Sequence, residues 1–212
     1  MLLTFCKGTM ADSNSDSLAF GAGKIILSVG YGYPNLDKWA FGNYYTYNNN
    51  KTYQSIGYGP IHFRAEYALS DKIGVGISLN YNTYGGTWHD AYANNNGWGY
   101  VSTGTYNFKK QIYSLTGLVR FNYHVFTTEK LDPYFSFGAG FKTIWKNYSS
   151  NAPDYVNEYY NELHSSDYGI SNLPASFEAV AGMRYYFTKK FAIYSELGMA
   201  KSLIQAGVSI GF

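Results

Sequence analysis

The sequence is short of cysteine, of charge and of long apolar runs. Its one cysteine, Cys6, excludes an intrachain disulfide framework and a zinc site built from several cysteines. Charged residues make up 14% of the chain, where soluble domains average about 25%, and the net charge of +2 argues against nucleic-acid binding. No stretch approaches the roughly 20 apolar residues of a membrane-spanning helix. We therefore expect neither a disulfide-stapled protein, nor a nucleic-acid binder, nor a helical membrane protein.

Aromatic residues and glycine are abundant instead. Tyrosine, phenylalanine and tryptophan together make up 20% of the 212 residues, and there are 24 tyrosines and 23 glycines. Disordered chains have few aromatic residues and a high net charge, so this composition indicates a folded protein. A length of about 200 residues is typical of a single β-barrel domain.

The first residues resemble the end of a secretion signal. An apolar segment at residues 2–5 precedes Thr9, Met10 and Ala11, which resemble a small-residue cleavage site. We interpret residues 1–11 as the remnant of a signal peptide or a flexible tail, residues 12–22 as an N-terminal segment, and residues 23–212 as the folded domain. Lipid attachment at Cys6 is disfavoured because Phe5 stands where a small residue is required.

From residue 23 onward the sequence alternates with a period of two, as β-strands with two different faces do. Eight runs show this pattern: residues 23–33, 56–69, 72–84, 109–125, 133–145, 173–187, 191–201 and 203–212. Each run is close to or longer than the ~9–11 residues that a tilted strand needs to cross a bilayer. The pattern predicts an all-β protein with eight membrane-crossing strands.

The two faces of these runs differ sharply in charge. One face holds 39 mostly apolar positions, none of them charged. The opposite face holds nine charged residues: Lys24, Arg64, Glu66, Lys110, Arg120, Lys142, Glu178, Arg184 and Glu196. A soluble, lipocalin-like barrel with the apolar face inside is the alternative. However, the charged face is also rich in glycine, which fits a cramped interior, and the apolar face ends in aromatic residues like a membrane girdle.

The connections between the runs predict how the barrel is oriented. Those after the second, fourth and sixth runs are short, whereas those at residues 34–55, 85–108 and 146–172 are long. Membrane barrels have short periplasmic turns and long extracellular loops. We therefore expect a closed, eight-stranded, antiparallel up-and-down barrel with both termini in the periplasm.

Three segments carry a family resemblance: DPYFSFGAGF at residues 132–141, AGMRYYFTKKFAIYSELGMA at residues 181–200, and GVSIGF at residues 207–212. With them the chain resembles the small OmpA-like and OmpX-like outer-membrane β-barrels of Gram-negative bacteria. The resemblance implies location in the bacterial outer membrane, with membrane lipid and lipopolysaccharide around the barrel. It also implies that the C-terminal Phe212 serves as an assembly signal for the barrel-assembly machinery. It implies no activity, because this fold hosts adhesins, enzymes and structural proteins.

The inward charged residues predict a barrel interior held by ion pairs. An eight-stranded barrel is only wide enough for its side chains to fill, and charges buried there must pair. We expect a structural network of Arg64, Glu66, Arg120, Lys142, Glu178, Arg184 and Glu196. Within it, Lys142 and Glu178 are expected to pair. The alternative is a gated narrow pore or a small transporter.

Catalytic and metal-binding patterns are weak. The four histidines lack metal-site spacing, and His62 and His124 are expected to point inward as hydrogen-bonded filler. The segment HSSDYG at residues 164–169 resembles a motif of the lipid A deacylase barrels, which would make His164 the base and Ser166 the nucleophile. Asp167 departs from the asparagine of that motif. We expect a protein that is not an enzyme and has no cofactor or metal, with a lipid A-modifying hydrolase as the alternative.

The predicted outer loops are rich in tyrosine, tryptophan and asparagine. Tyrosine and tryptophan supply rigid contact area at low entropic cost, as binding surfaces require. Residues 153–164 could form a short amphipathic helix. The loops therefore predict a surface that recognises a partner membrane protein, a glycan or lipopolysaccharide.

Overall fold

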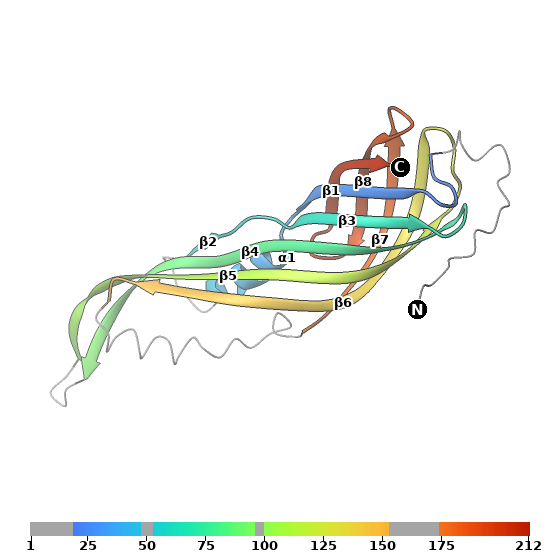
Figure 1. Ribbon diagram of the computed structural model, residues 1–212. Coiled ribbons are helices and arrows are strands. Elements are labelled where there is room, and N and C mark those ends of the chain that lie inside the picture. The colour runs from blue at the N-terminus through green and yellow to red at the C-terminus, as the bar shows by residue number, and fades with distance from the viewer. Residues whose placement is uncertain (1–18, 48–52, 96–99, 153–173) are drawn as a thin grey trace, which may run out of the picture.

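The computed structural model describes residues 19–47, 53–95, 100–152 and 174–212 (Figure 1). Their eight long strands are β1 (Ile25–Tyr33), β3 (Ile61–Ala68), β4 (Ile73–Asn95), β5 (Tyr100–His124), β6 (Leu131–Ser150), β7 (Ala175–Tyr186), β8 (Phe191–Met199) and β9 (Ile204–Gly211). Each long strand pairs antiparallel with the next, and β9 also pairs with β1 from Ile26↔Gly211 to Tyr33↔Ile204. The sheet is therefore closed, and the predicted eight-stranded barrel is confirmed.

The apolar face of the strands lies on the outside of the barrel. Each strand exposes a large apolar side chain there: Leu27, Phe63, Ile77, Val119, Phe137, Phe177, Leu197 and Ile210. The exposed fractions reach 68% for Val119 and 74% for Phe177. The inward positions hold buried polar side chains such as Ser78, Thr116 and Ser136. A soluble barrel has the reverse arrangement, so this exterior suits hydrocarbon and the predicted faces are confirmed.

Three adjacent strands continue far beyond the others, as Figure 1 shows for β4, β5 and β6. Above the row Gly85↔Gln111↔Asn147 they form a three-stranded extension, which we call the blade (residues 85–95, 100–111 and 147–150). The long loop predicted at residues 85–108 is thus wrong in its secondary structure, because most of it continues the β4–β5 ladder. A bulge between Tyr92 and Ala93 interrupts this ladder once.

The two faces exchange their character where the blade begins. Within the barrel the inward side chains are mostly polar, but in the blade the same parity carries Trp88 and Phe108, both 1% exposed and stacked 5.9 Å apart. The opposite parity, apolar in the barrel, carries Thr87, Lys109 and Ser149 in the blade. A change from hydrocarbon to water on the outer side at this height accounts for the exchange.

The first long connection contains helix α1 (Leu36–Tyr47) and the short strand β2 (Gln54–Ile56), which pairs with β4 at Gly85–Thr87. Asn35 caps the helix, since its Oδ1 accepts a hydrogen bond from the Lys38 N–H at 3.0 Å. Among the described residues, no helix is long and apolar enough to cross a bilayer. The second predicted run began at residue 56, but β3 begins at Ile61. Gly57 and Gly59 adopt positive φ angles before it, which interrupts the extended chain.

Residues 19–22 pack against the barrel and cover its short-turn end. The Phe20 ring is fully buried and stacks on His124, with ring centroids 3.4 Å apart. The Ala19 N–H donates to the Thr128 carbonyl at 2.9 Å, and the Ala22 N–H donates to Asp71 at 3.0 Å. These bonds tie the segment to the β5–β6 and β3–β4 turns.

Candidate functional site

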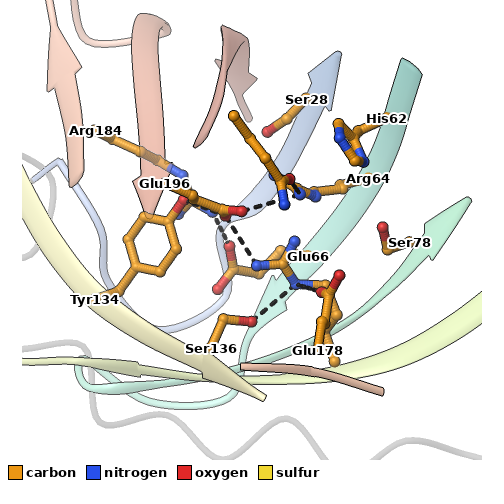
Figure 2. A network of polar contacts seen from close by, with 12 residues as sticks. Ser28, His62, Arg64, Glu66, Ser78, Tyr134, Ser136, Glu178, Arg184 and Glu196 are labelled. Carbon is orange, nitrogen blue, oxygen red and sulfur yellow. Dashed lines mark hydrogen bonds and ion pairs between the residues drawn. The ribbon is translucent and has the colours of Figure 1, made fainter. Parts of the chain in front are cut away.

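The charged side chains of the barrel gather into a network across its interior (Figure 2). They converge because inward residues of facing strands meet in a lumen that is only wide enough for side chains. Arg120 of β5 lies at the centre of the network. Its Nε lies 3.1 Å from Glu178 Oε1 of β7 and also donates to Ser136 Oγ of β6 at 2.9 Å, and its Nη2 donates to Glu196 Oε1 of β8 at 2.9 Å. One guanidinium thus connects four strands.

Glu196 links this centre to the far wall. Its Oε2 lies 2.9 Å from Arg64 Nη2 of β3, and its Oε1 also accepts the Tyr134 hydroxyl at 2.8 Å. Arg64 donates in addition to Gln205 of β9 and lies over the Tyr194 ring, 5.3 Å from its centroid. The network therefore reaches across the full width of the lumen.

A second cluster lies nearer the short-turn end. Arg184 donates to Glu66 and, from Nη1 at 3.2 Å, to Asp132 Oδ2. The two ring nitrogens of His124 lie 2.9 Å from Glu66 and 2.5 Å from Asp132. Arg184 also lies over the Tyr134 ring, 4.5 Å from its centroid, which connects the two clusters. Phe20 packs against His124 from the short-turn end.

A third set of contacts lies toward the opposite mouth, where α1 begins. Asp37 Oδ2 accepts hydrogen bonds from Asn82 Nδ2 at 3.0 Å and from Lys201 Nζ at 3.2 Å. Asn35 Nδ2 donates to the Thr83 carbonyl at 3.1 Å. These contacts attach the first turn of α1 to β4 and to the β8–β9 turn, so the lumen has polar closures at three heights.

The structure brings together six of the seven residues predicted for the network. Lys142 is the exception, and its predicted pairing with Glu178 is wrong. The β6–β7 register places Gly138 opposite Glu178, and Lys142 lies four positions further along β6, about 13 Å away along the strand. Lys142 lies instead opposite Thr116, and its backbone N–H donates to Pro174 at 2.6 Å.

The structure adds four residues to the predicted network. Asp132 lies just before the predicted run at residues 133–145, although its even position matches the inward parity of β6. Tyr134, Ser136 and Gln205 carry no formal charge, so the charge pattern does not select them. Parity identifies all four, since each alternates with outward residues such as Phe135 and Ala206.

The weaker candidate sites have different outcomes. His62 is buried, and its Nδ1 lies 2.7 Å from Asn80 Oδ1. Within the described ranges, no group of three or more histidine, cysteine, aspartate or glutamate side chains is placed to hold a metal ion. His164, Ser166 and the amphipathic helix predicted at residues 153–164 lie outside the described residues.

Closure by eight strands, an apolar exterior and an ion-paired interior occur together in this chain. This is the fold of the small outer-membrane β-barrels. No protein-family profile matches the sequence, and no curated protein matches it. The fold assignment therefore depends on the strand pairing and faces described above.

Solved structures of the same kind show remote similarity. The N-terminal β-barrel domain of Pseudomonas aeruginosa OprF is 18% identical, with a TM-score of 0.41, over 91% of this chain and 98% of that one. A de novo designed transmembrane β-barrel is 16% identical, with a TM-score of 0.39, over 90% and 95%. The attachment invasion locus protein Ail of Yersinia pestis, solved with the heparin analogue sucrose octasulfate, is 13% identical, with a TM-score of 0.37, over 90% and 99%.

Proposed function

We propose that this protein is an outer-membrane surface-recognition barrel, with both termini in the periplasm and the blade outside the cell. In this proposal the barrel serves as a rigid, non-conducting anchor. The blade contacts a partner protein, a glycan or lipopolysaccharide. The observation that carries the proposal is the contrast between a lumen crossed by buried ion pairs and a long extension of three hydrogen-bonded strands.

The filled lumen supports an anchoring role rather than transport. Arg120, Glu178 and Glu196 are each at most 4% exposed and bridge opposite walls. Moving such charges aside for a solute would break several buried ion pairs at once, at a cost of several kcal/mol each. Phe20 at one end and the α1 contacts at the other add further closures.

The blade supports a recognition role. Its strands remain hydrogen-bonded outside the apolar band, so they present side chains from a rigid sheet. Rigid surfaces lose less conformational entropy on binding than mobile loops do. The described outward side chains His89, Asn107, Lys109 and Ser149 are polar and exposed, whereas the inner side is packed around Trp88 and Phe108.

Blade deletion tests the recognition role. Joining Thr87 to Lys109 through an Asn-Gly turn removes residues 88–108 at a register pair and leaves the barrel strands intact. Wild-type and shortened proteins, each in fluorescent liposomes, are incubated with beads coated with lipopolysaccharide, acidic glycans, neutral glycans or outer-membrane proteins. We expect the wild-type liposomes to be retained on at least one coating and the shortened form to be lost from it. Equal retention of both forms on every coating would overturn the proposal.

Planar-bilayer recording tests the anchoring role. We expect the wild-type protein to show no steady conductance at any moderate voltage, because ion pairs fill the lumen. The variant Arg120→Ala, which removes the central guanidinium, is the matched comparison. Steady conductance by the wild-type protein would support the pore alternative instead.

A further inference from the structure

The outer side of the blade carries a hollow of about 400 Å³. Two rows of outward side chains line it: Thr87, Lys109 and Ser149 in the lower row, and His89, Asn107 and Asn151 in the upper row. In each row, one residue comes from β4 and one from β5. The third is Ser149, next to the last residue of β6, in the lower row and Asn151, just beyond β6, in the upper row. The Asn107 N–H donates to Asn151 Oδ1 at 2.7 Å, which fixes the upper row.

The lining has a definite chemical character. It combines one lysine with hydroxyl, amide and imidazole groups and with the two aromatic residues Trp88 and Phe108, and none of the described lining residues is acidic. Hydroxyl and amide side chains both donate and accept hydrogen bonds, as sugar hydroxyl groups do. Lys109 is exposed and supplies a cation that favours a phosphate or carboxylate group. Trp88 and Phe108, in the row between, also line the hollow, and their rings stack on each other in a buried cluster.

The hollow lies a short distance beyond the end of the apolar band. Tyr113 and Trp145 pair in register and mark the end of the apolar band on β5 and β6. Lys109 lies four residues beyond Tyr113 on the same side of β5, about 13 Å along the strand. The hollow is therefore close to the membrane surface but outside the hydrocarbon, where sugars of a membrane's outer leaflet are within reach.

We propose that this hollow binds a saccharide bearing a phosphate or carboxylate group, with Lys109 contacting the anionic group. The inference deepens the proposed recognition function and rests on it. The saccharide can come from lipopolysaccharide in the same membrane or from a free acidic glycan, because both offer the same chemistry.

Isothermal titration calorimetry on the refolded full-length protein tests the site and its source. The probes are a lipid-free phosphorylated core oligosaccharide of lipopolysaccharide, the same oligosaccharide after removal of its phosphates, and a hyaluronan hexasaccharide. Binding of the core oligosaccharide alone would assign the site to lipopolysaccharide, and binding of hyaluronan would assign it to free acidic glycans. Loss of the phosphates should weaken core binding about tenfold or more.

Single substitutions then locate the site. Lys109→Gln should weaken binding of the charged probe by about tenfold, because it removes a charge-assisted hydrogen bond. Ser149→Glu should weaken it similarly by adding a negative charge beside Lys109. The matched control Lys72→Gln removes an exposed lysine from the β3–β4 turn, at the other end of the barrel, and should bind as the wild type does. A heat-dependent gel shift checks that each variant is folded.

The results separate the two proposals. If no charged saccharide binds the wild-type protein, or if Lys109→Gln binds as well as the wild type, the saccharide site is refuted. The recognition function still stands in that case if the blade deletion abolishes retention on the beads. If the blade deletion has no effect on retention, the recognition function itself fails.

Discussion

At the scale of single residues, two outward positions of the same strand face different surroundings. Along β6, Ala139 faces outward in the apolar band, whereas Ser149 faces outward in the blade. Both are small and exposed, and they differ chiefly in whether lipid or water surrounds them.

Arginine substitution at these two positions measures that difference. Ala139→Arg should lower the free energy of unfolding in lipid vesicles by about 2–4 kcal/mol, because it places a cation near the bilayer midplane. Ser149→Arg should change it by less than about 0.5 kcal/mol. Urea titration followed by tryptophan fluorescence gives both values. Equal losses would mean that the boundary between band and blade has been misplaced.

Arg120 offers a second test at this scale. Arg120→Met leaves Glu178 and Glu196 with less compensation in a closed interior, so unfolding should become easier by roughly 3–5 kcal/mol. Lys142→Met should lower the free energy of unfolding by less than about 1 kcal/mol, because Lys142 points inward but is only half-buried. A loss at Lys142 as large as that at Arg120 would restore Lys142 to the network.

At the scale of elements, β9 closes the barrel as the alternation predicted. Gln205 and Ser209 point inward, whereas Ile204, Val208, Ile210 and Phe212 are exposed outside. An unpaired edge in hydrocarbon would leave several backbone groups without partners, at a cost of several kcal/mol each. The pairing of β9 with both β1 and β8 avoids that cost.

Deletion of Phe212 separates closure from assembly. The deletion removes two backbone hydrogen bonds between Phe212 and Ile25, one in each direction. Refolding into detergent should be nearly normal, while insertion into the outer membrane of cells should fall sharply if this residue is the assembly signal. Membrane fractionation with a heat-dependent gel shift reports both. Normal insertion in cells would refute the signal assignment and leave the barrel unaffected.

The sequence predicted the strands and their faces because burial in lipid imposes strict alternation on each run. The blade was not predicted because its outward positions are polar and its inward positions are apolar, the reverse of the barrel. Thr87 and Lys109 therefore do not match the apolar outer face. The sequence missed α1 because LDKWAFGNYYTY has no clear apolar stripe. It mispaired Lys142 because counting from the turns assumes level strands, and the actual register offsets β6 against β7.

At the scale of the whole molecule, closure at the short-turn end depends on residues before the first strand. Phe20 joins Ile26 and Ala68 in a buried cluster and covers His124. The charged interior is thereby separated from the solution at that end.

Phe20→Ala should reduce the free energy of unfolding by about 3–5 kcal/mol, as large-to-small changes at buried aromatic positions do. The change should also speed exchange of the Ala19 amide hydrogen, which donates to the Thr128 carbonyl in the β5–β6 turn. Phe126→Ala, at an exposed aromatic residue in that turn, serves as the comparison and should have a smaller effect. Unchanged exchange in Phe20→Ala would show that residues 19–22 do not hold the turn.

The exchange of faces at the foot of the blade also fixes how deep the protein sits. The apolar outward side chains of β5 run from Tyr123 to Tyr113, eleven residues that rise about 25 Å at a strand tilt of about 40°. That height is the hydrophobic thickness of the barrel, and it sets the bilayer thickness that the protein matches. Bilayers much thicker than this would draw Gln111 and Lys109 into hydrocarbon, and folding yield should decline as acyl chains lengthen.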